Sequence, residues 1–254
     1  MSIYIGQLAL VRPETEYKAT ICCCFISHMA DYKKIIPHLH PQERDYYDAL
    51  KFEKRIKSYL MGRFVAKQAV AFLTGNHNLE DILIHPGIFT QPIVVCHTQN
   101  IQVSITHCDD FGVALAFPEA HPMAIDLEQM SIDKRDVIER QATDYEKDII
   151  NALSVPYDVG LTLLWTAKEA LSKALKTGLM TPFNIFEISQ IDYNDKYMIS
   201  YYNNFAQYKA MSFTIGNYMC SMVYPVKTEV CFNIQACKAH FAFLNSANEG
   251  TPHG

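Results

Sequence analysis

Residues 93–128 read IVVCHTQNIQVSITHCDDFGVALAFPEAHPMAIDLE, and this stretch decides the fold class. It contains four apolar segments of strand length, at residues 93–95, 102–106, 113–117 and 124–128. Turn-forming residues separate these segments, and the turn at 109–112 indicates an antiparallel hairpin. The stretch therefore predicts a sheet.

Helical patterns lie on both sides of this sheet. Residues 41–73 repeat apolar side chains at helical spacing, with Pro41 near the start and Gly75 just past the end, which predicts one or two amphipathic helices. Gly62 in this segment costs about 1 kcal/mol relative to alanine, so we expect a close backbone approach there. Further helices are predicted at about 133–153, interrupted near Thr143, and at 158–176, followed by Gly178.

The end of the chain returns to strand composition. Residues 186–224 are rich in Tyr, Ile, Phe and Met, which is consistent with a second small sheet. The order helix, strands, helix, strands predicts an α+β fold of two similar halves. We expect an N-terminal half at 1–118, a C-terminal half at 119–228, and a partly disordered extension at 229–254.

Composition limits the class of protein. The chain has 254 residues, of which 49% are hydrophobic and 19% charged, so it can bury a sizeable core. Its net charge of −5 argues against non-specific nucleic-acid binding. No long apolar segment or signal-like start occurs, so we expect no membrane association and a cytoplasmic protein. Its 8 cysteines form no CxxC pair, and we expect reduced thiols.

Two carboxylates mark the last of the four strands. Asp126 and Glu128 lie two residues apart, so both side chains leave the same face of a strand. Mg²⁺ usually takes one or two protein carboxylates and fills its remaining positions with water and phosphate oxygens. The pair is therefore a candidate Mg²⁺ and phosphate site, although a solvated strand face would show the same spacing.

The helix predicted at 158–176 carries a second set of charges. Glu169 and Lys173 share one face, either as functional groups or as an ordinary i,i+4 pair that stabilises the helix by about 0.2–0.5 kcal/mol. Upstream, Thr106 and His107 end a strand just before the hairpin turn. A hydroxyl and an imidazole there suit a phosphate, although an incidental histidine among 10 is the simpler interpretation.

The order of these motifs along the chain is more informative than any one of them alone. Ser104-Ile-Thr-His107, Ala124-Ile-Asp-Leu-Glu128 and Trp165-Thr-Ala-Lys-Glu-Ala-Leu-Ser-Lys-Ala174 together resemble the signature of the Sfp-type 4′-phosphopantetheinyl transferases, and the third motif is the most specific. Further segments resemble the family in the same order: Tyr59-Leu-Met-Gly-Arg63 with Lys67, and Thr143 with Glu146. The resemblance spans roughly residues 41–180.

The resemblance implies a fold and a reaction. The fold would be two α+β halves in a pseudo-twofold monomer, with coenzyme A bound in the cleft between them. The reaction would be Mg²⁺-dependent transfer of the 4′-phosphopantetheine arm of coenzyme A to a serine of an acyl, peptidyl or polyketide carrier protein, with release of adenosine 3′,5′-bisphosphate. Such carriers serve fatty-acid biosynthesis and secondary metabolism.

The resemblance also implies the metal site and the base. Asp126, Glu128 and Glu169 would hold Mg²⁺ against the coenzyme A diphosphate. Glu169 would act as the base, either directly on the carrier serine or through a metal-bound water.

Four residues are expected to bind coenzyme A on the same basis. Lys173 would pair with a diphosphate oxygen. Thr106 and His107 would contact phosphates, with His107 at the 3′-phosphate, and Lys168 would be a further phosphate contact.

Two departures from the family pattern bear on coenzyme A binding. Many relatives read Gly-Lys-Pro where this chain reads Thr90-Gln91-Pro92, so a phosphate-binding lysine is lost. Upstream basic contacts are replaced by Glu43-Arg44, and Arg44 is a candidate substitute. Ala124 replaces a glycine of the first metal motif, a change that a strand tolerates.

Two other functions remain open from the sequence. One is a protein that binds coenzyme A or a carrier without transfer, which the loss of lysine at Gln91 favours. The other is a Mg²⁺-dependent phosphohydrolase that uses the same acidic residues, which would leave the segment 165–173 unexplained.

Overall fold

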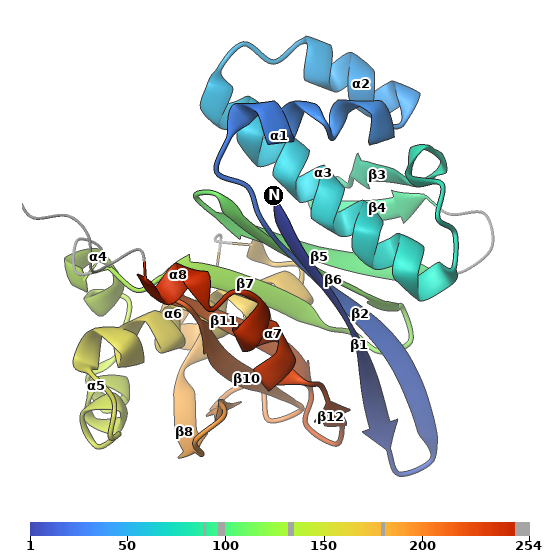
Figure 1. The fold of residues 1–254 in the computed structure, drawn as a ribbon. Coiled ribbons are helices and arrows are strands. Elements are labelled where there is room, and N and C mark those ends of the chain that lie inside the picture. The colour runs from blue at the N-terminus through green and yellow to red at the C-terminus, as the bar shows by residue number, and fades with distance from the viewer. Residues whose placement is uncertain (89, 96–99, 132–134, 179–180, 247–254) are drawn as a thin grey trace, which may run out of the picture.

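Two antiparallel sheets form the framework of the protein (Figure 1). The computed structural model describes residues 1–88, 90–95, 100–131, 135–178 and 181–246. The first sheet has the order β12-β1-β2-β6-β5-β4-β3, and the second has the order β7-β11-β10-β9-β8. The protein is therefore α+β, as predicted.

The two sheets are built from β1 to β12, and the helices α1 to α8 lie between and after these strands in the chain. The strands are β1 (Ser2–Arg12), β2 (Thr15–Phe25), β3 (Leu83–Pro86), β4 (Pro92–Val95), β5 (Ile101–Cys108), β6 (Phe111–Pro118), β7 (Ala124–Gln129), β8 (Ile188–Tyr193), β9 (Met198–Tyr202), β10 (Tyr208–Ile215), β11 (Tyr218–Pro225) and β12 (Glu229–Cys231). The helices are α1 (Met29–Lys33), α2 (Pro41–Asp48), α3 (Glu53–Thr74), α4 (Arg135–Glu139), α5 (Asp144–Asn151), α6 (Tyr157–Ala174), α7 (Ile234–His240) and α8 (Phe243–Ser246).

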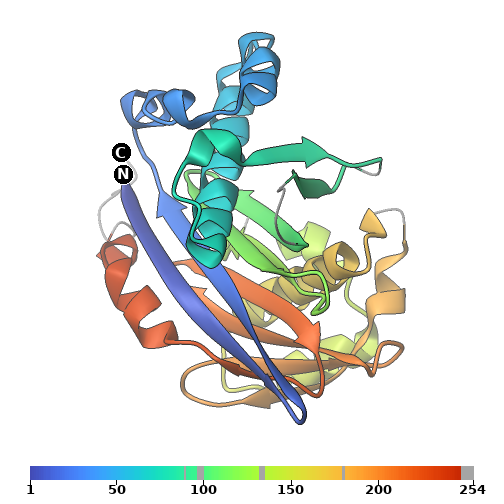
Figure 2. The ribbon, with the colours of Figure 1, turned by 90° about the vertical axis from the view of Figure 1, so that its right-hand side faces the viewer.

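The two sheets share one core, and a long helix covers the outer face of each. On β2, Cys23 faces the core between the sheets, whereas Cys22 and Cys24 face α3. On β11, Cys220 faces the same shared core, whereas Met219 packs in the cluster under α6. This alternation follows from the two-residue period of a strand. The layers therefore run α3, first sheet, second sheet, α6 (Figure 2).

Several predicted elements are confirmed, and two expectations are wrong. The helical pattern at 41–73 forms two helices, and Gly75 follows α3 with φ of 74°. The strand at 124–128 does not continue one sheet with 93–117, because β7 pairs with β11 in the second sheet; this pairing agrees with the expected start of the C-terminal half at residue 119. The close approach expected at Gly62 is also absent, since a Cβ there would meet Ile105 Cγ2 at an ordinary 3.5 Å.

The C-terminal segment folds back onto the first sheet. β12 pairs with β1, and Ile234, Cys237 and Phe241 are buried in the core between the sheets. Residues 229–246 are thus part of the fold, while 247–254 lie outside the described residues. The seven cysteines of the described ranges are free thiols, and Cys96 lies outside them. No helix in the described part of the chain is long and apolar enough to cross a membrane.

Candidate functional site

Each sheet, with the helices packed on it, is called here one half of the protein, and the two halves meet where β5 lies beside β7. Ser104 and Thr106 lie on one face of β5, and their hydroxyls accept hydrogen bonds from the backbone N–H groups of Ile125 (3.1 Å) and Leu127 (3.2 Å). β7 is the edge strand of the second sheet, so these hydroxyls satisfy donors that would otherwise lack a partner strand. Asp126 is therefore held between two fixed amides at the junction of the halves.

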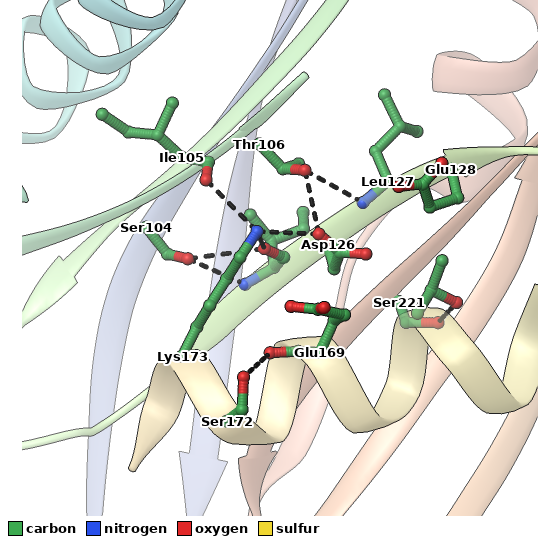
Figure 3. Close-up of polar contacts among 12 residues, drawn as sticks. Ser104, Ile105, Thr106, Asp126, Leu127, Glu128, Glu169, Ser172, Lys173 and Ser221 are labelled. Carbon is green, nitrogen blue, oxygen red and sulfur yellow. Dashed lines mark hydrogen bonds and ion pairs between the residues drawn. The ribbon is translucent and has the colours of Figure 1, made fainter. Parts of the chain in front are cut away.

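Asp126 and Lys173 form the centre of this junction (Figure 3). The Asp126 Oδ1 atom accepts a hydrogen bond from Thr106 Oγ1 at 3.0 Å and lies 2.7 Å from Lys173 Nζ. Lys173 reaches from α6 to both strands, where it also donates to the carbonyl oxygens of Ile105 (3.4 Å) and Ile125 (3.3 Å). The other carboxylate oxygen of Asp126, Oδ2, is buried and has no hydrogen-bond partner among the described residues. A buried unpaired oxygen is costly unless a donor or a cation reaches it.

Glu169 points from α6 toward Asp126 (Figure 3). Burial, and then the charge of Asp126, raise the pKa of Glu169 to about 7. The Lys173 ammonium opposes this rise, and Glu128 adds to it. Negative charge is thus concentrated here beyond what Lys173 alone balances.

These side chains line a cavity of about 570 Å³ between the halves. Thr106, His107, Asp126, Glu128, Glu169 and Lys173 all line it, so the structure brings together every predicted site residue except Lys168. The His107 Nε2 atom lies 2.7 Å from Ser58 Oγ, and partial desolvation, followed by the Lys173 charge, lowers the pKa of His107.

Helix α3 supplies cavity residues that the sequence motifs do not identify as site residues. Arg55, Ser58, Tyr59 and Arg63 line the cavity from the first half. The Arg63 guanidinium lies over the Tyr59 ring at 4.8 Å from its centroid. The spacing 55, 59, 63 places these residues on one helix face, and this periodicity was a usable signal.

A second cavity of about 320 Å³ adjoins the first and is mostly apolar. The two share Thr90, Pro92, Ile105 and Lys173 in their walls. Gln91, Val103, Phe117, Met123 and Lys176 line only the second cavity. Thr90 and Lys176 have φ of 65° and 58°, left-handed values that favour glycine, so both hold strained backbone at this wall.

The structure does not bring Lys168 to the site. Its ammonium is buried and lies 2.6 Å from Glu146 Oε2, and it donates to the Gln141 carbonyl oxygen at 3.1 Å. A lysine enclosed in this way has no access to a phosphate, so the predicted phosphate contact is not supported. Arg44 is likewise bound elsewhere, to the Ile36 carbonyl oxygen at 2.9 Å.

The donor chemistry of the site fits Mg²⁺. Three carboxylates, those of Asp126, Glu128 and Glu169, line one cavity, and no described residue offers a hydrogen bond to the buried Asp126 Oδ2. Within the described ranges, however, no three His, Cys, Asp or Glu side chains are placed closely enough to form a metal-binding group. In this arrangement the Lys173 ammonium supplies the positive charge beside Asp126.

Comparison with known families adds an independent observation. Residues 122–223 match the model of the 4′-phosphopantetheinyl transferase superfamily. This segment contains β7 and α6, and with them Asp126, Glu128, Glu169 and Lys173. The part of the chain that carries these site residues is therefore similar to this superfamily.

The solved structures to which this chain is similar are distant from it. One is a holo-(acyl-carrier-protein) synthase from Bacillus anthracis in complex with CoA (3′,5′-ADP), with 22% identity over 43% of this chain and 96% of that chain and a TM-score of 0.33. Another is a holo-ACP-synthase from Plasmodium yoelii, with 18% identity over 46% of this chain and 96% of that chain and a TM-score of 0.29. No curated protein matches the chain.

Proposed function

We propose that the protein transfers the 4′-phosphopantetheine arm of coenzyme A to a serine of a carrier protein, in a Mg²⁺-dependent reaction that releases adenosine 3′,5′-bisphosphate. The observation that carries this proposal is the convergence of Asp126, Glu169 and Lys173 on one cavity between the halves. They come from β7 and α6, and they supply the carboxylates and the cation that phosphoryl transfer from a diphosphate requires.

The two adjoining cavities suit the two ends of coenzyme A. The larger one contains Arg55, Arg63 and His107, so it suits the phosphates of the adenosine end. The smaller one is mostly apolar and suits the pantetheine arm. Lys173 lines both cavities, which supports placing the diphosphate at their junction.

The reaction forms one bond and breaks one bond. The carrier serine oxygen bonds to the phosphorus on the pantetheine side of the diphosphate, and the bond from that phosphorus to the bridging oxygen breaks. Glu169 accepts the serine proton, directly or through one water. Lys173 stabilises the charge that develops on the diphosphate oxygens.

The remaining residues hold these groups in place. Mg²⁺, held by Asp126, Glu128 and Glu169, would neutralise charge on the leaving diphosphate oxygen when bound. Thr106 orients Asp126 through its 3.0 Å hydrogen bond. His107 binds the 3′-phosphate from the exposed side of the cavity.

The natural partner belongs to one of the carrier classes of fatty-acid, polyketide or peptide synthesis. We place the Sfp-type activity in the cytoplasm and expect a monomer, because both halves of the cavity come from one chain.

The proposal is tested by incubating the protein with coenzyme A, Mg²⁺ and an apo carrier domain, and weighing the carrier by intact mass spectrometry. The expected result is a gain of about 340 Da on the carrier serine, the mass of a transferred phosphopantetheine group. An unmodified carrier despite measurable coenzyme A binding would instead favour a binding protein without transfer. Phosphate release from simple esters would favour a phosphohydrolase.

A further inference from the structure

In the part of the chain that the structure describes, each half contains a Glu–Lys ion pair in which both side chains are buried. Glu146 Oε2 lies 2.6 Å from Lys168 Nζ, with side-chain exposures of 0% and 1%. Glu43 Oε2 lies 2.5 Å from Lys67 Nζ, with exposures of 2% and 1%. Buried charges are rare unless paired, so two such pairs in one small protein call for a physical account.

The two pairs are bonded to the backbone in the same way. Glu146 is the third residue of α5, and its Oε2 accepts from the N–H of the capping residue Thr143 while its Oε1 accepts from Ile188 N–H. In the first half, Glu43 is the third residue of α2. Its Oε2 accepts a hydrogen bond from the N–H of the capping residue His40, and its Oε1 accepts one from the N–H of Ile84 on β3.

Each lysine adds a bond to a carbonyl oxygen. Lys168 donates to Gln141, and Lys67 donates to His38 (2.8 Å) and Leu79 (3.0 Å). Each pair thus joins a short capped helix, a long helix and the first strand that follows the long helix. Repetition of the same atoms in both halves supports the pseudo-twofold relation between them.

The two long helices, α3 and α6, place different functional residues near the lysine of the ion pair. On α6, Lys168 is followed directly by Glu169, and successive helix residues point about 100° apart. Holding Lys168 on one side of α6 therefore fixes the direction of Glu169 toward Asp126. Under the same helix, Thr166 Oγ1 lies 2.6 Å from Ser221 Oγ on β11, which limits rotation further.

On α3, the Glu43–Lys67 pair contacts a residue one helical turn before the lysine. Arg63 precedes Lys67 by four residues, and its Nε lies 3.5 Å from Glu43 Oε1. The guanidinium is thus held between Glu43 and the Tyr59 ring, at the wall of the larger cavity.

We propose that the two pairs are positioning devices with different tasks: Glu146–Lys168 sets Glu169 for the metal and the reacting serine, and Glu43–Lys67 sets Arg63 for the phosphates of coenzyme A. This rests on the proposed function. None of the four paired residues lines either of the two adjoining cavities. Each acts instead through a neighbour on the same helix or through the carboxylate that it orients.

The test replaces each pair by an uncharged pair of similar volume, as Glu146→Gln/Lys168→Met and Glu43→Gln/Lys67→Met. Each double variant is the matched control for the other, since the same chemistry is removed in each half. If a double variant does not fold by near-ultraviolet circular dichroism, the single Glu→Gln variant of that half is measured. Coenzyme A binding and Mn²⁺ binding are measured by calorimetry, and kcat and KM by carrier modification.

The expected results differ between the halves. Glu146→Gln/Lys168→Met should weaken Mn²⁺ binding about tenfold and lower kcat, with coenzyme A affinity unchanged. Glu43→Gln/Lys67→Met should weaken coenzyme A binding and raise its KM, with Mn²⁺ affinity unchanged. Folded variants that change the same quantities, or neither quantity, overturn the proposal. Wild-type protein that binds coenzyme A but never modifies a carrier contradicts the proposed function instead.

Discussion

Removal of the Lys173 ammonium is the most informative single change. This lysine spans the junction of the halves, because its Nζ contacts Asp126 on β7 and the carbonyl oxygens of Ile105 and Ile125. In Lys173→Ala these contacts disappear together, and the cavity gains space without losing a carboxylate. The variant therefore separates the role of the cation from the role of the acidic residues.

The structure predicts a large kinetic effect and a small effect on stability. The Lys173 side chain is 30% exposed, so its ion pair with Asp126 is screened and contributes about 1 kcal/mol or less to the free energy of unfolding. Loss of a preorganised charge at developing negative charge typically costs about 3–4 kcal/mol of transition-state stabilisation. That corresponds to a fall in kcat of roughly 10²–10³-fold.

The assay compares steady-state transfer to a carrier with urea unfolding of the same preparation. Lys196→Ala is the matched control, because it removes one lysine charge at the turn between β8 and β9, at the far edge of the second sheet from β7. A Lys173→Ala variant with normal kcat and only a raised KM for coenzyme A would refute the reasoning, since the lysine would then bind ground state and transition state equally.

Four further outcomes are expected. Asp126→Asn and Glu169→Gln should reduce transfer by more than about 10³-fold while the thermal unfolding midpoint changes by only a few degrees, because neither side chain is part of an apolar core cluster; a clear collapse in the midpoint would contradict this. Gln91→Lys should tighten coenzyme A binding about five- to tenfold by calorimetry, since it adds a cation to the cavity wall. Lys176→Gly should raise the free energy of unfolding by roughly 0.5–1 kcal/mol, because Lys176 has φ of 58°, and an unchanged urea midpoint would argue against strain there. Chelation with EDTA should abolish transfer, and added Mg²⁺ should restore it. Transfer that continues after chelation would show that the reaction does not need the metal.

The sequence motifs predicted much of the site because they are local. The two-residue period of β7 and the helical spacing of α6 place Asp126, Glu169 and Lys173 correctly on their elements, and the structure brings these elements together. Lys168 shows the limit of this approach. It lies inside the most specific motif, yet its side chain points away from the cavity into a buried pair with Glu146, which is 22 residues distant in the sequence.

The other features that the sequence does not predict depend on pairing between strands far apart in the chain. The hairpin of β1 and β2 supplies two strands of the first sheet, and none of the sequence patterns considered above predicts it. The pairing of β12 with β1 joins segments more than 200 residues apart, and no local pattern reports it. Likewise, β7 joins the second sheet through β11, a choice made by packing and not by the strand pattern itself.

The central claim is that the cavity between the halves transfers phosphopantetheine and does not merely bind coenzyme A. The most direct measurement quantifies two products in one reaction: modified carrier by intact mass, and adenosine 3′,5′-bisphosphate by chromatography. We expect equal molar amounts of both products with wild-type protein and neither product with Asp126→Asn. Adenosine bisphosphate without modified carrier, or modified carrier at wild-type rate from Asp126→Asn, would contradict it.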